Sequence, residues 1–289
     1  MNKRQAYCFR DRWAARSESR YIIQLLITEL AISMSHTTPK KKFVILTTQR
    51  AGSVFLEKYL HSHPQIGCFG EVLLGMGGPQ TPWIPAWLTR YRRPRLAWYY
   101  ALSGAMVSPK RTIKTVFEQD FERVGFRWMY NQLQDRRALA PLAADPSIAI
   151  IHLMRKNVLK QYVSRYIMRR HRHLGRLRAH TTKELKPVAV NIPPSLAEKG
   201  IRRLLSRRNQ YKEAFKSHRT IELVYEEMIQ NNQIMPQSVE SICNILEVSN
   251  EFEEPQLKKM NPSTLSLMLT NFDEWQSHFK NTEFAEMLE

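Results

Sequence analysis

The feature of this chain that most constrains its fold is an alternation of short apolar runs with segments of helical periodicity. A continuous apolar run of four to six residues is typical of a strand that is buried on both faces of a sheet. Strands separated by helices form parallel sheets with helices on both faces. We therefore predict an α/β fold with a central, mostly parallel sheet of five strands flanked by helices. The predicted strands are Phe43–Thr47, Ile66–Phe69, Val124–Met129, Ile148–Leu153 and Thr220–Val224.

Helices are predicted where apolar residues recur at helical spacing. They cover Val54–His61, Arg155–Arg170, Leu196–Lys216, Ser238–Leu246 and Glu283–Leu288.

The chain is predicted to have two parts. Residues 1–38 form a leader and linker, and residues 39–289 form a single domain with an aromatic and basic insert at about 72–115. The apolar stretch Tyr21–Ile32 is far short of the ~20 apolar residues that a membrane span requires. Because Met34 stands just before the linker, whether residues 1–33 belong to the native protein stays open, as does any contact of theirs with a membrane.

The charge of the chain is concentrated in its middle. The formal net charge is +18, whereas residues 1–38 carry +3 and residues 240–289 carry −7, which leaves +22 between them. Within that middle, residues 155–178 hold nine Lys and Arg and no Asp or Glu. Apolar residues at helical spacing within this stretch predict a helix with a basic face. So basic a chain implies an anionic partner, which can be a nucleic acid, an acidic membrane or a phosphorylated small molecule.

The three cysteines, Cys8, Cys68 and Cys243, lack any CxxC spacing. An odd number without that spacing argues against a disulfide framework and a cysteine zinc site, and is typical of a reducing compartment. No His and carboxylate cluster has metal-ligand spacing either, so no metal is expected. We expect a cytoplasmic protein, with peripheral contact to a membrane left open.

The loop after the first strand has the composition of an anion-binding loop. It runs Thr48-Gln49-Arg50-Ala51-Gly52-Ser53 and leads into a helix. Small residues allow backbone N–H groups to approach phosphate oxygens, and a helix N-terminus adds partial positive charge. The Walker A pattern is absent, because no Lys precedes the Ser. A plain turn with a serine cap would explain Gly52-Ser53 equally well.

A second candidate anion site follows the fourth strand. Arg155 comes directly after this strand, and Ser164 lies nine residues further on. The planar fork of an arginine suits a bidentate phosphate contact, and a serine hydroxyl is a further donor. Because the first and fourth strands can be close in a doubly wound sheet, the two sites could hold opposite ends of one nucleotide.

Several blocks, which occur along the chain in the order expected of the family, resemble the sulfotransferase family that uses 3′-phosphoadenosine 5′-phosphosulfate. The main ones are TTQRAGSVFLEKYLHSHPQIGCFGE and IIHLMRKNVLKQYVSRY, with weaker similarity in VGFRWMYNQL and NFDEWQSHFKNTEFAEML. The resemblance spans roughly residues 43–288 and is nearest to the bacterial branch that modifies carbohydrates and glycolipids. It implies a P-loop-like, three-layer fold and the transfer of a sulfuryl group to a hydroxyl acceptor, with no metal and no nucleic acid as partner.

The resemblance also assigns roles to single residues. The 5′-phosphosulfate is bound by the first loop, which comprises Thr48, Gln49, Arg50, Ala51, Gly52 and Ser53, and the 3′-phosphate is bound by Arg155 and Ser164. Arg50 stands where many members have Lys; it keeps the charge but is a poorer proton donor. The glycine-rich C-terminal cofactor loop of the cytosolic eukaryotic members is not recognisable, and we assign no role to Lys258 and Lys259.

The proposed general base is Glu71, in the motif Cys68-Phe69-Gly70-Glu71. Family members with Gly-Glu at this place use the carboxylate to activate the acceptor hydroxyl. The alternative is that Glu71 only pairs with a basic residue. His61 and His63 are the next candidates, whereas His152 lies within a predicted buried strand and is expected to be a core histidine.

Aromatic and basic residues crowd the insert that follows Glu71. Trp83, Trp87 and Tyr91 lie among Arg90, Arg92 and Arg93. Such rings can stack on sugars, rest at a lipid headgroup layer or pack a helical subdomain. We predict that Trp83, Trp87 and Tyr91 contact the acceptor, and packing alone is the alternative.

Two other functions remain open from the sequence. A protein without catalysis could use the basic helix to bind nucleic acid, with an affinity that falls steeply with salt. A P-loop kinase is disfavoured because the Gly-Lys pair and a clear magnesium carboxylate are missing. Neither the acceptor nor the oligomeric state can be told from the sequence.

Overall fold

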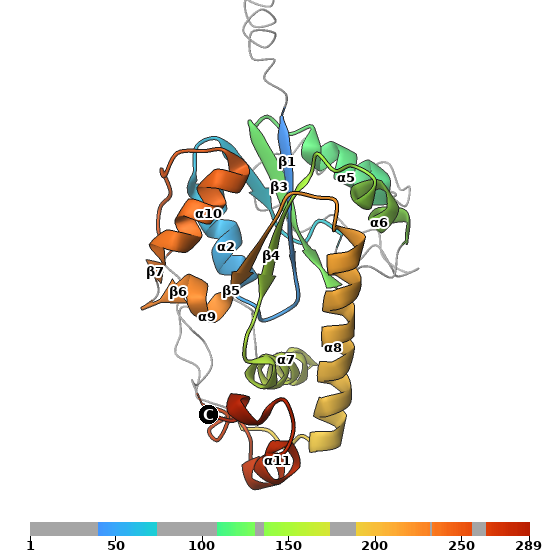
Figure 1. Ribbon diagram of the computed structural model, residues 1–289, viewed down its shortest axis with the longest axis vertical. Helices are drawn as coiled ribbons and strands as arrows, with labels where there is room; N and C mark the ends of the chain where they lie inside the picture. The colour runs from blue at the N-terminus through green and yellow to red at the C-terminus, as the bar shows by residue number, and fades with distance from the viewer. Residues whose placement is uncertain (1–39, 74–108, 131–135, 174–188, 232, 256–263) are drawn as a thin grey trace, which may run out of the picture. The chain divides into compact units, whose positions relative to one another are not determined.

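The five predicted strands form one sheet in a computed structural model, which describes residues 40–73, 109–130, 136–173, 189–231, 233–255 and 264–289 (Figure 1). Their order is β2-β3-β1-β4-β5, and every neighbouring pair is parallel. The predicted α/β class with a central five-stranded sheet is confirmed. The strands are β1 (Lys41–Thr47), β2 (Ile66–Phe69), β3 (Arg123–Met129), β4 (Ala149–Met154) and β5 (Thr220–Val224).

The position of β1 in this order determines where the candidate site lies. It pairs with β3 on one side and β4 on the other, with Ile45 opposite both Arg127 and Ile151. Because the strands are parallel, the loops that follow them leave the sheet at one edge. Ligands of open α/β sheets bind at this carboxyl edge, where the strand order reverses.

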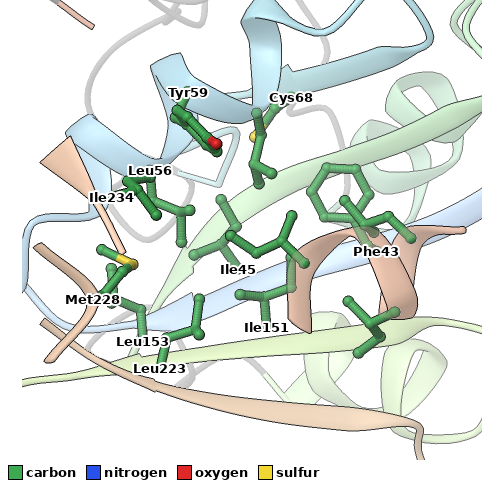
Figure 2. Packing of buried hydrophobic residues seen from close by; sticks show 14 of the residues in the cluster. Phe43, Ile45, Leu56, Tyr59, Cys68, Ile151, Leu153, Leu223, Met228 and Ile234 are labelled. Carbon is green, nitrogen blue, oxygen red and sulfur yellow. The ribbon is translucent and has the colours of Figure 1, made fainter. Parts of the chain in front are cut away.

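Each face of the sheet is covered by helices. On one face Val44, Leu46, Phe126 and Trp128 belong to a buried cluster with residues of α5 (Pro109–Phe117), α6 (Arg136–Ala143) and α8 (Pro194–Ala214). On the other face Phe43, Ile45, Ile151 and Leu153 pack with α2 (Ser53–Ser62) and α10 (Pro236–Leu246), as Figure 2 shows in part. Successive side chains of a strand point to opposite faces, so one apolar run supplies both clusters.

A third buried cluster lies beyond the carboxyl edge of the sheet. It joins α7 (Val158–His173), the first turns of α8, α11 (Phe272–Phe279) and the 3₁₀ helix η2 (Ala285–Met287) (Figure 1). Trp275 is fully buried here, and its indole N–H donates to the carbonyl of Ile192 at 2.8 Å. This cluster fixes α7 next to the strand ends.

The boundaries of several helices differ from the prediction. The helix predicted from Arg155 begins at Val158, because the side chain of Asn157 accepts the N–H of Lys160 and caps the first turn. The last predicted helix is only the 3₁₀ turn η2. The sequence patterns missed α5, α6, α11, the short helix α9 (Tyr225–Met228) and the hairpin of β6 (Ile229–Gln230) and β7 (Gln233–Ile234).

The predicted leader and most of the predicted insert lie outside the described residues. Within the described part of the chain, no helix has both the length and the apolar character needed to cross a membrane.

Candidate functional site

The loop between β1 and α2 has an unusual backbone. Arg50 has a φ of 66° and Gly52 a φ of 83°, both in the left-handed region. A non-glycine residue costs about 1–2 kcal/mol there, so the surroundings must hold Arg50 in place. One contribution is a hydrogen bond from Thr47 Oγ1 to the carbonyl of Leu153 at 2.9 Å, which ties the end of β1 to β4.

Gly52 is required by two independent features. Besides its positive φ, a Cβ atom at this position would lie 2.2 Å from Cδ2 of Tyr225. Ser53, the next residue, begins α2, and its Oγ accepts a hydrogen bond from Nη1 of Arg127 at 3.1 Å. The first N–H groups of a helix have no partner within the helix, so this end of α2 is suited to an anion.

The two predicted anion sites are contiguous. Nε of Arg50 donates to Oγ of Ser164 at 2.9 Å, and Nη1 of Arg155 donates to the carbonyl of Arg50 at 3.3 Å. Gln161 on α7 also donates to the carbonyl of Gln49 at 3.1 Å. Burial, and then the charge of Arg155, lower the pKa of Arg50 from its ordinary value. The guanidinium groups of Arg50 and Arg155 therefore lie close together in a partly desolvated site, where a bound anion would reduce their repulsion.

Arg155 also has partners that the sequence patterns did not predict. Its Nε donates to Glu226 at 3.1 Å, and its guanidinium lies 4.6 Å from the ring centre of Tyr225. Burial alone would raise the pKa of Glu226, but the N–H of Lys156 and the charge of Arg155 together hold it below its usual value. Tyr225 and Glu226 directly follow β5, and this position at the end of a parallel strand is the signal that could have identified them.

Arg127 connects the start of α2 with Glu71. It is a buried residue of β3, and its Nε lies 3.0 Å from Oε2 of Glu57. Its Nη2 lies 3.7 Å from Oε1 of Glu71, and its Nη1 bonds to Ser53. The pairing that we considered for Glu71 is therefore present, with a guanidinium that also holds the first residue of α2. An arginine inside an otherwise apolar strand was the sequence signal for Arg127.

The candidate histidines have structural partners. The Nδ1 atom of His61 accepts the N–H of Cys68 at 3.3 Å, and burial lowers the pKa of this ring. His63 is buried, and its Nδ1 accepts the N–H of Gln65 at 3.2 Å. His152 is also buried, with its Nε2 against the hydroxyl of Tyr130, and burial lowers its pKa to about 4.

The predicted acceptor contacts Trp83, Trp87 and Tyr91 lie outside the described residues. In the described ranges, no three His, Cys, Asp or Glu side chains are grouped so that they could hold a metal ion.

Comparison with known proteins gives similarity at the level of structure only. No protein-family model matches the chain, and no curated protein sequence is a match. A crystal structure of a sulfotransferase from Alicyclobacillus acidocaldarius aligns with 87% of this chain and 95% of its own, at 17% identity and a TM-score of 0.46. The sulfotransferase domain of the Synechococcus PCC 7002 olefin synthase aligns with 88% of this chain and 94% of its own, at 14% identity and a TM-score of 0.46. These values are too low to assign a reaction, so the function has to be argued from the residues of the site.

Proposed function

We propose that this protein transfers a sulfuryl group from 3′-phosphoadenosine 5′-phosphosulfate to a hydroxyl acceptor. The contact between Arg50 and Ser164, 114 positions apart in the chain, is the observation that carries the proposal. It joins the two sequence blocks in which the donor-binding residues were expected. The donor set also fits a nucleotide with anionic groups at two positions, because two guanidinium groups and a helix N-terminus meet there.

In this proposal different residues bind the two ends of the donor. Arg50, Gly52 and Ser53, with the loop residues Thr48, Gln49 and Ala51, hold the 5′-phosphosulfate. Arg155 and Ser164 hold the 3′-phosphate. A guanidinium has five N–H donors, and the bonds from Arg155 to Glu226 and to the carbonyl of Arg50 use two of them. The others can bind a phosphate while Glu226 keeps the side chain oriented.

The proposed reaction is one in-line displacement. The acceptor oxygen forms a bond to sulfur as the bond from sulfur to the bridging oxygen breaks, and adenosine 3′,5′-bisphosphate leaves. Glu71 takes the proton of the acceptor hydroxyl, and Arg50 stabilises the negative charge that develops on the bridging oxygen. Arg127 is a positioning residue in this scheme, because it contacts both Glu71 and Ser53.

The acceptor class follows from the family resemblance, which points to a carbohydrate or glycolipid. Trp83, Trp87 and Tyr91 remain the proposed contacts for it. A cytoplasmic location stays part of the same proposal.

Calorimetric titration with adenosine 3′,5′-bisphosphate tests the donor site. We expect binding by the native protein and an affinity about tenfold or more weaker in Arg155→Ala, because a charge-assisted contact to phosphate is lost. Arg202→Ala is the matched control, since this arginine pairs with Glu198 and Glu283 on the surface. No heat with the native protein, or equal affinity in Arg155→Ala and the control, would overturn the proposal.

Transfer of labelled sulfate to a glycolipid and polysaccharide extract tests the reaction. With Glu71→Gln we expect a rate about 100-fold lower and unchanged nucleotide affinity, because only the proton acceptor is removed. An unchanged rate would show that Glu71 only forms an ion pair.

A further inference from the structure

A cavity of about 430 Å³ lies between α7 and α8, next to the loop that follows β1. One face of each helix lines it, with residues three and four positions apart along both helices. Thr48 of the loop and Tyr130 at the end of β3 complete the wall near the sheet. Its volume is in the range of small-molecule sites, ~300–1,000 Å³.

The cavity is lined by positive charge without compensation. Five cations surround it, and none of the described residues that line it is Asp or Glu. Within the part of the chain that the structure describes, none of the five forms an ion pair with a carboxylate. The acid Glu198 of α8 is directed elsewhere, to Arg202 and His278. The five cations are Arg165, Arg169, Lys199, Arg203 and Arg207.

Arg165 is buried close to other positive charges. Burial, followed by the charges of Arg169 and Arg207, lowers its pKa to about 10. Its Nε is buried and has no hydrogen-bond partner in the described structure. A buried polar atom without a partner destabilises the fold. The arrangement is therefore one that a bound anion would stabilise.

Aromatic rings share this cavity with the cations. Tyr130, Tyr162 and Tyr166 line it. Tyr162 approaches α8 at Gly200, where a Cβ atom would lie 2.3 Å from its Cε2. Glycine in a helix interior costs up to ~1 kcal/mol relative to alanine, so this contact gives a reason for Gly200. Faces of aromatic rings beside cations suit a ligand with an apolar ring face and an anionic substituent.

We propose that this cavity binds the acceptor through an anionic group, so that the acceptor is a sugar which already carries a phosphate, sulfate or carboxylate. The inference rests on the proposed function and names the substrate class. The cavity touches the donor loop through Thr48, and Arg165 directly follows Ser164, which contacts Arg50. A sugar held there by its anionic group would have its hydroxyls near the donor loop.

Titration calorimetry with lactose 6′-sulfate, lactose 6′-phosphate and lactose, at saturating adenosine 3′,5′-bisphosphate, tests this inference. We expect the two anionic disaccharides to bind at least about tenfold more tightly than lactose. In the double variant Arg203→Gln/Arg207→Gln that preference should disappear. The matched control is Arg202→Gln/Lys216→Gln, which removes two charges from the other side of α8 and the turn after it and should keep the preference.

The outcomes separate this inference from the proposed function. Adenosine 3′,5′-bisphosphate should bind the double variant and the control equally, and a loss confined to the double variant would assign the cavity to the donor. Equal binding of lactose and its charged derivatives, or no binding of any, would overturn the inference while nucleotide affinity still supports the proposed function. Tighter binding of a single-stranded oligonucleotide that displaces the disaccharides would instead make the cavity part of a nucleic-acid interface.

Discussion

Two basic regions lie next to each other at the carboxyl edge of the sheet, and they differ in how their charge is compensated. Around the donor loop Arg155 pairs with Glu226, and Arg127 pairs with Glu57 and Glu71. In the α7–α8 cavity five cations lie together, and no carboxylate is among the lining residues that the structure describes. An anion is proposed to bind in both regions, but carboxylates orient Arg155 and Arg127 before it binds, whereas no described carboxylate pairs with the cations of the cavity. The difference predicts opposite responses to the removal of a charge.

The largest effect is expected from Arg127→Met. This change leaves Glu57, whose side chain is only 3% exposed, without its guanidinium. Breaking a buried pair costs about 3–5 kcal/mol, so the free energy of unfolding measured in urea should fall by that amount. Arg123→Met on the same strand is the control; it loses hydrogen bonds to the carbonyls of Leu246 and Glu247, and we expect a smaller loss of about 1–2 kcal/mol. Equal losses of unfolding free energy in the two variants would show that the buried pair of Arg127 and Glu57 contributes no more to stability than the hydrogen bonds of Arg123.

Two glycines, one in each region, give the next test. Gly52 and Gly200 each approach a tyrosine ring, but only Gly52 has a positive φ. Gly52→Ala should lower the free energy of unfolding by about 2 kcal/mol, because the strained backbone adds to the clash. Gly200→Ala should cost less, since alanine gains helix propensity of ~1 kcal/mol and the ring of Tyr162 is only partly buried. A larger loss for Gly200→Ala would contradict the assignment of the two positions.

Acid should weaken the compensated region selectively. The pKa of Glu226 is held below its ordinary value in the folded protein. Its contribution is therefore present at neutral pH and is lost as the pH falls through the folded pKa. Comparing the native protein with Glu226→Gln by urea unfolding, we expect a difference of about 1–2 kcal/mol at pH 7 that shrinks below pH 4. A difference independent of pH would mean that the carboxylate charge does not matter.

The smallest effect is expected from Arg207→Gln, which should raise the free energy of unfolding where the other variants lower it. Burial lowers the pKa of Arg165 most, and the charges of Arg169 and Arg207 lower it further. Because Arg207→Gln removes one of these like charges, it should stabilise the protein by about 0.5 kcal/mol at low salt. Added sodium chloride should stabilise the native protein and reduce the advantage of the variant, since it screens the repulsion. Thermal unfolding at two salt concentrations measures both. Destabilisation by Arg207→Gln at low salt would contradict this prediction, because it would show that the positive charges of the cavity do not repel one another.

Much of the framework was predictable because it depends on local patterns. All five strands were located to within two residues, since a buried strand of a parallel sheet is a continuous apolar run. α6 was missed because Pro141 interrupts its pattern, and α9 because four residues are too short to show a period. The predicted start of α7 was three residues early, because Arg155 continues the basic pattern although Asn157 caps the helix.

The sequence by itself determined the five strands of the sheet, the loop with Arg50 and Gly52, and the positions of Arg155 and Ser164 after the fourth strand. Those features arise from neighbours in the chain. Only the tertiary structure decided that Arg50 meets Ser164, that Arg127 joins Ser53 to Glu71, and that the basic face of α7 lines a cavity with α8. The amino-acid type fixes the charge of a side chain, but the partner and the burial of that side chain depend on which strands and helices become neighbours.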